Sequence, residues 1–158
     1  MNVLFLCLGN ICRSPIAAAL LRKKFQENNI LGEVESAGFE TYFINEPADA
    51  RAIELARKYG VDISDHRARL FRDEDMKKFN LIFVMDHKNM RDVKNFIKDQ
   101  THLNKVDYLM NLVEPGKNMN LADPFYHELE KGEEVLLMLD QACDKIVERV
   151  KNSEVSNV

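Results

Sequence analysis

The fold is decided by the stretch VLFLCLGNICRSP, residues 3–15. It begins with a continuous apolar run at 3–6, as expected of a strand buried in a parallel sheet. Ser14 and Pro15 then predict the start of a helix, because Ser caps helices well and Pro suits the first helical position. Between them lies a loop from Cys7 to Arg13. Its backbone N–H groups can point at an anion bound at the helix N-terminus.

Short apolar runs and helical patterns continue to alternate along the chain. We expect further strands at 34–37, 81–85 and 106–110, and further helices at 49–59, after Asp86, and at 129–150. Loops are expected at 38–47 and 114–125. Cys7, Asp86 and the loop bearing Asp123 all follow strands, so they are candidates to converge at one edge of the sheet. The alternation predicts one α/β domain over 1–150, a three-layer sandwich around a mostly parallel sheet of about four strands. A polar tail at 151–158 is expected to fray.

Composition narrows the class of protein. The chain has 158 residues, of which 46% are hydrophobic and 30% charged, which is typical of one globular domain. Its net charge of −4 argues against a nucleic-acid-binding surface, so an anion site must be local. The apolar run at 3–6 is too short for a signal peptide, and no stretch is long enough to span a membrane. The default expectation is the reducing cytoplasm, where Cys7 would be kept as a thiol, and a monomer, although the sequence leaves the oligomeric state open.

The loop carries residues suited to nucleophilic chemistry on a bound anion. The helix N-terminus and Arg13 favour a thiolate at Cys7, and Arg13 can hold two phosphate oxygens at once. Gly9 permits a tight turn, and the Ser14 hydroxyl can reach the thiolate. A lone Cys is more often a buried small apolar residue, but this combination favours a nucleophile. Neither a zinc site nor a nucleotide P-loop is indicated, and no metal or cofactor is expected.

Asp123 is the candidate proton donor. It precedes Pro124 in a Gly- and Pro-containing loop, where functional residues are common, and Phe125 and Tyr126 follow as possible walls for an aromatic substrate. A positioned carboxylic acid would accelerate departure of the leaving oxygen roughly 10²–10⁴-fold. The alternative is that Asp-Pro only marks a turn, which is the commoner role of that pair taken alone.

Together, the Cys7–Arg13 loop and the segment Asp123-Pro124-Phe125-Tyr126 resemble the low-molecular-weight protein tyrosine phosphatase family. The resemblance covers most of the chain. It implies a flavodoxin-like fold, Cys7 as nucleophile, Arg13 as phosphate clamp and Asp123 as general acid. The residues that it implies for binding phosphate in the loop are Leu8, Gly9, Asn10, Ile11, Cys12 and Ser14.

The resemblance also implies supporting roles. Asn10, Ser36 and His66 match positions that hold the loop through hydrogen bonds, and Tyr42, Leu8, Phe125 and Tyr126 match the substrate rim or walls. Cys12 matches a cysteine that can form a reversible disulfide with Cys7. The chain departs from the family pattern at Phe125, where many members carry Tyr, and at Asn45, where Gly is common.

Three alternative functions compete with this interpretation. Related arsenate reductases need further resolving cysteines, whereas only Cys143 remains, inside an amphipathic helix. Related protein-arginine phosphatases carry Thr at the position of Ile11, whose apolar bulk favours a flat aromatic ester. A non-catalytic phosphotyrosine adaptor would not need Cys7, Arg13 and Asp123 together. The expected reaction is hydrolysis of phosphotyrosine in a protein, in bacteria a tyrosine kinase or its targets, with inorganic phosphate as product or inhibitor.

Overall fold

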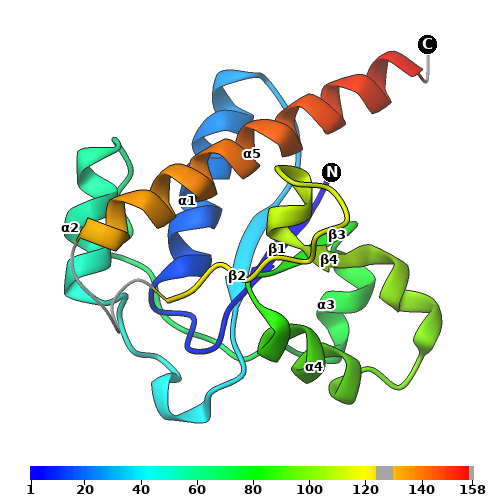
Figure 1. Cartoon of the computed structure of the whole chain (residues 1–158), viewed down its shortest axis with the longest axis horizontal. Helices are drawn as coiled ribbons and strands as arrows, with labels where there is room; N and C mark the ends of the chain where they lie inside the picture. Colours follow the sequence, from blue (N-terminus) through cyan, green and yellow to red (C-terminus); the bar gives the residue numbers. More distant parts are fainter. Residues whose placement is uncertain (124–129, 157–158) are drawn as a thin grey trace.

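The computed structural model describes residues 1–123 and 130–156. Within them, one parallel sheet has the strand order β2-β1-β3-β4 (Figure 1). Its strands are β1 (Val3–Leu6), β2 (Val34–Ala37), β3 (Leu81–Val84) and β4 (Val106–Tyr108). Leu6 lies level with Ala37 and Val84, so three strands end together at one edge of the sheet.

Helices cover both faces of the sheet. Those with bounds in the described residues are α1 (Arg13–Glu27), α2 (Ala50–Lys58), α3 (Asp73–Lys78), α4 (His87–Phe96) and α5 (Glu130–Ser156). Phe5 packs with α1, α2 and α5 in one core cluster, while Leu4 packs with α3 and α4 in the other. Figure 1 shows α5 lying across α1, with α3 and α4 on the opposite side. The predicted three-layer α/β sandwich with a four-stranded parallel sheet is confirmed.

Alternation of side chains explains the two cores. Successive residues of a strand point to opposite faces, so Val3 and Phe5 face one layer and Leu4 and Leu6 the other. Phe5 stacks on Phe83 of β3, with ring centroids 6.0 Å apart. All of β1 is fully buried, as its unbroken apolar sequence predicts.

Several elements differ from the sequence prediction, among them the unpredicted 3₁₀ helices Thr41–Phe43 and Gln100–Lys105. Helix α3 was not predicted, because its sequence DEDMKK carries one apolar side chain and shows no helical period. The strand expected at 106–110 ends at Tyr108, and Leu109–Leu112 form a 3₁₀ helix. Finally, α5 continues beyond Val150 to Ser156, into the polar tail that was expected to begin at Lys151. No Gly or Pro interrupts the helix there, and Ser153 donates a hydrogen bond to the Val150 carbonyl.

The topology places the Cys7 loop at a binding position. The chain leaves β1 toward β2 on one side and later returns to β3 on the other side. Ligands of such sheets bind at this change of direction, beyond the carboxyl ends of the strands. Cys7 directly follows β1, and Asp86 follows β3 after one residue. No helix in the described part of the chain is long and apolar enough to cross a membrane.

Candidate active site

A small hollow opens above the end of β1. Its volume is about 40 Å³, which is room for a group of a few atoms. The residues that line it are Cys7, Leu8, Gly9, Ile11, Cys12, Arg13, Phe43 and Asp123. The fold thus brings Asp123 to the Cys7 loop from far along the sequence. In the described residues, no group of His, Cys, Asp and Glu side chains is arranged to hold a metal ion.

The loop backbone is arranged to bind an anion. Its carbonyls accept hydrogen bonds from segments outside the loop: Leu8 O accepts from Phe39 N at 2.9 Å, and Ile11 O accepts from Asp49 N at 2.8 Å. Among the described residues, none of the N–H groups from Leu8 to Arg13 donates to a protein acceptor. Successive unpaired N–H groups at a helix N-terminus form a concave anion site.

Arg13 is anchored through one nitrogen and leaves another unpaired. Its Nη1 donates to Asp86 Oδ2 at 2.9 Å and to the Leu121 carbonyl at 2.7 Å. Its Nε is buried and has no hydrogen-bond partner in the described part of the chain. Burial lowers the pKa of Arg13, but the charges of Cys7 and Asp86 outweigh burial and raise it. Arg13 is therefore a fixed cation, with hydrogen-bonding capacity left for a ligand.

Cys7 lies at the bottom of this site. It is only 3% exposed, and its Sγ is 2.9 Å from Ser14 Oγ. A thiolate can only accept a hydrogen bond, so Ser14 donates to Cys7 when the thiol is ionised. The unpaired loop amides, the start of α1 and the Arg13 cation all favour that charge.

Asn10 holds the loop from within. It is fully buried and has a φ of 56°, in the left-handed region that Asn tolerates better than most residues. Its Nδ2 donates to Ser14 Oγ at 2.8 Å and to Ser36 Oγ at 2.9 Å. Its backbone carbonyl lies 2.6 Å from His66 Nε2, and a carbonyl only accepts, so Nε2 carries the proton. Asn10, Ser14, Ser36 and His66 thus form one hydrogen-bonded group behind the hollow.

His66 makes the stability of this group depend on pH. Burial lowers the pKa of His66 below its ordinary value of about 6.5. The unfolded chain therefore takes up the proton more readily, and stability is lost as pH falls through about 6.5. We expect the free energy of unfolding, measured by urea denaturation, to fall less below this pH in His66→Gln than in the wild type. His102→Gln serves as the control. An unchanged slope in His66→Gln would contradict the prediction.

Asp86 belongs to the site, as expected from its position after a strand that ends at the same sheet edge as β1. It also caps a helix, as expected, by accepting from Asn89 N at 2.8 Å through Oδ1. Its other oxygen binds Arg13, a pairing that the sequence prediction did not include.

The rim is made by the loop after β2. Phe43 lines the hollow, whereas Tyr42 is 81% exposed and meets Phe43 edge-on with centroids 5.1 Å apart. Asn45 has a φ of 65°, and Asn is among the few residues besides Gly that accept this conformation. Phe125 and Tyr126, also expected at the rim, lie outside the described residues.

The two other cysteines have separate environments. Cys12 lines the hollow with Cys7; burial chiefly, then the charges of Asp123 and Cys7, raises its pKa well above the ordinary value, so it stays protonated. Cys143 is fully buried beneath α1 and donates to the Ala17 carbonyl at 3.6 Å. Its interpretation as a core residue is confirmed.

Comparison with known proteins agrees with this geometry. The family model described as low molecular weight phosphotyrosine protein phosphatase matches residues 2–156. Proteins of that name from Gallus gallus and Homo sapiens are 35% and 34% identical, over 94% of both chains in each pair. A solved protein tyrosine phosphatase from Entamoeba histolytica has a TM-score of 0.89 at 27% identity, covering 98% of this chain and 99% of its own.

A solved low molecular weight protein tyrosine phosphatase from T. tengcongensis has a TM-score of 0.84 at 32% identity. It covers 94% of this chain and 99% of its own. The similarity therefore spans the β1 loop, the strand edge and α5 alike. The chain belongs to the low molecular weight phosphotyrosine protein phosphatase family.

Proposed function

We propose that this chain hydrolyses phosphotyrosine in proteins through a phosphocysteine intermediate on Cys7. The observation that carries the proposal is the set of unpaired donors around Cys7: the loop N–H groups and the buried Nε of Arg13. A phosphoryl group satisfies these donors, since its oxygens are strong acceptors and carry negative charge. Membership in the low molecular weight phosphotyrosine protein phosphatase family supports the reaction class, hydrolysis of a phosphate ester.

In the first step, Cys7 Sγ attacks phosphorus in line with the departing oxygen. The S–P bond forms as the P–O bond to tyrosine breaks, and Asp123 gives its proton to the phenolate oxygen. The loop amides and Arg13 bind the three equatorial oxygens. They are already in place before the reaction, so stabilising the transition state requires little reorganisation.

In the second step, Asp123 takes a proton from water. The water oxygen attacks phosphorus, the S–P bond breaks, and inorganic phosphate leaves with the Cys7 thiolate restored. The hydrogen bond from Ser14 stabilises this thiolate as a leaving group. Bound phosphate occupies the same donors, so phosphate is expected to inhibit competitively.

Substrate choice follows from the walls of the hollow. Ile11 and Phe43 line it with apolar surface, which suits the flat ring of phosphotyrosine better than a charged guanidinium. We further propose that the enzyme works as a cytoplasmic monomer on protein substrates, tyrosine kinases among them. Cys12 is proposed to protect Cys7: peroxide oxidises Cys7 to the sulfenic acid, which condenses with the Cys12 thiol and loses water.

A substrate comparison tests the proposed function. Wild-type protein should release phosphate from a phosphotyrosine peptide with a kcat/KM at least roughly tenfold above that for the phosphoarginine or phosphoserine counterpart. Released phosphate is measured colorimetrically, with the unphosphorylated peptide as the blank. A higher kcat/KM for the phosphoarginine peptide would show that phosphoarginine, and not phosphotyrosine, is the substrate class. Binding of the phosphotyrosine peptide without any release would instead indicate an adaptor.

A further inference from the structure

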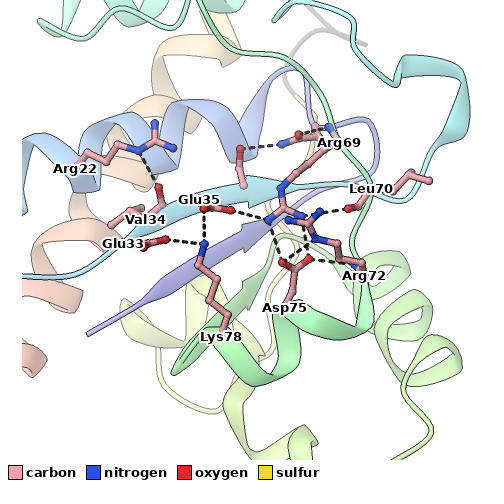
Figure 2. Close-up of polar contacts among 11 residues, drawn as sticks. Arg22, Glu33, Val34, Glu35, Arg69, Leu70, Arg72, Asp75 and Lys78 are labelled. Atoms are coloured by element: carbon pink, nitrogen blue, oxygen red, sulfur yellow. Dashed lines mark hydrogen bonds and ion pairs between the residues drawn. The ribbon is translucent and has the colours of Figure 1, made fainter.

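An ion-pair group lies beside the phosphate loop, between β2 and α3. We call it the Arg69 cluster; Figure 2 shows its members Glu35, Arg69, Asp75 and Lys78 pointing toward one another. Arg69 binds Asp75 with both terminal nitrogens, Nη1 to Oδ2 at 2.9 Å and Nη2 to Oδ1 at 3.1 Å. The same Nη2 donates to Glu35 Oε2 at 2.8 Å. None of these side chains lines the hollow at Cys7.

The centre of the cluster is buried, and its outer end is exposed. Asp75 is 1% exposed and also accepts from the Arg72 backbone N–H at 3.0 Å. Lys78 lies at the outer end, where its Nζ is 2.9 Å from Glu35 Oε1 and 2.6 Å from Glu33 Oε2. A buried carboxylate is costly unless it is paired, so Arg69 has one strongly preferred position.

The backbone of Arg69 connects the cluster to the phosphate loop. Its N–H donates to Asn10 Oδ1 at 3.0 Å, and its carbonyl accepts from Gly38 N at 2.9 Å. The fit is close, because a Cβ on Gly38 would lie 2.8 Å from Leu8 O. A backbone N–H can only donate, so it fixes which end of the Asn10 amide faces Arg69. The Nδ2 group must then face Ser14 and Ser36.

This orientation determines the direction of the next hydrogen bonds. Ser14 Oγ accepts from Asn10 Nδ2, which leaves the Ser14 hydrogen free for Cys7 Sγ at 2.9 Å. We propose that Arg69 and Asp75 are positioning residues for the nucleophile, which they aim through Asn10 and Ser14 so that Ser14 donates to the Cys7 thiolate. The proposal rests on the proposed function only in taking Cys7 as the nucleophile.

Other charged groups also act on Cys7 and are left intact in the test. Arg13, from α1, supplies the nearest cation, with Asp86 of the α4 N-terminus behind it. Asp123 and the Cys12 thiol share the hollow with Cys7. Every variant below keeps these four groups. A change in Cys7 ionisation therefore reports on the relay, by which we mean the hydrogen bonds that lead from Arg69 through Asn10 and Ser14 to Cys7.

The test measures Cys7 ionisation in two ways. The first is the rate of alkylation by iodoacetamide at each pH, followed at Cys7 by fragment-ion mass spectrometry. The second is the acidic limb of kcat/KM for an aryl phosphate. Each measurement yields an apparent pKa, one from the alkylation rates and one from the acidic limb, and in Arg69→Ala the two should rise together. At pH values below this pKa, alkylation should slow roughly tenfold, because Ser14 no longer donates its hydrogen bond to the charged thiolate. Asp75→Asn, which keeps the side-chain size, should shift them in the same direction.

Lys78→Ala is the matched control, because it removes a cation from the same Glu35 carboxylate without touching Arg69. It should leave both pKa values unchanged. If Arg69→Ala and Asp75→Asn lose stability but keep the wild-type alkylation profile, the two residues are merely structural and the proposal is wrong. Wild-type protein that alkylates at low pH yet releases no phosphate would refute the proposed function, while the alkylation shift would still test the relay.

Discussion

Cys7→Ser is expected to lower kcat for a phosphotyrosine peptide by at least about 10⁴-fold. The serine hydroxyl has nearly the same shape, but at neutral pH it is not ionised and is a far weaker nucleophile than a thiolate. The loop N–H groups and Arg13 remain, so the variant should still bind the peptide. Both quantities are measured on one preparation, by phosphate release and by calorimetric titration.

Cys143→Ala is the control for Cys7→Ser. It also removes a buried thiol, but one packed under α1 and not at the hollow. Its kcat should match the wild type, even if its unfolding midpoint falls. Turnover by Cys7→Ser within tenfold of the wild type would exclude a phosphocysteine intermediate at this residue.

Asp123→Ala is expected to slow the enzyme in a way that depends on the leaving group. For phosphotyrosine, whose phenolate is a poor leaving group, kcat/KM should fall roughly 10²–10⁴-fold. For an ester of an acidic phenol, such as dinitrophenyl phosphate, the loss in kcat/KM should be much smaller, because that phenolate departs without a proton. The measurement is the slope of log kcat/KM against the phenol pKa, which should become steeper in the variant; kcat/KM is used because it does not include hydrolysis of the phosphocysteine, in which Asp123 also acts.

Two further variants make the Asp123 prediction discriminating. Glu114→Ala removes a surface carboxylate that pairs with Lys117 and should leave the slope unchanged. Asp86→Ala removes the carboxylate that anchors Arg13 and should slow all esters by a similar factor. Equal slowing of all esters by Asp123→Ala would remove Asp123 as the acid. A steeper slope in Asp86→Ala instead would assign the acid to Asp86.

The elements with strong local signals were predicted well. The run Val3–Leu6 and the strand Val34–Ala37 have the bounds that were expected, and Asp49 and Asp86 cap α2 and α4 through their side chains. Helix α3 was missed because its stability comes from one buried apolar side chain, Met76, and from the tertiary pairing of Asp75 with Arg69. Neither contact leaves a periodic pattern in the sequence.

The site residues likewise fall into those that the local sequence predicts and those that only the tertiary structure brings together. Cys7, Arg13 and Ser14 are close in sequence, so their spacing already predicts a phosphate loop opening a helix. The partners that fix them come from elsewhere: Asp86 and the Leu121 carbonyl on Arg13, His66 and Arg69 on Asn10. Tyr42, expected at the rim, stands exposed beside Phe43, which lines the hollow.

By itself, then, the sequence determined the local parts: a buried strand, an anion-binding loop and the start of a helix around Cys7. These depend on apolar runs, caps and turn residues that act over a few positions. Only the tertiary structure decided which distant groups meet the loop, because the strand order β2-β1-β3-β4 brings the ends of β1 and β3 together. The Arg69 cluster exists for the same reason, since pairing buried charges requires that β2 and α3 are already packed.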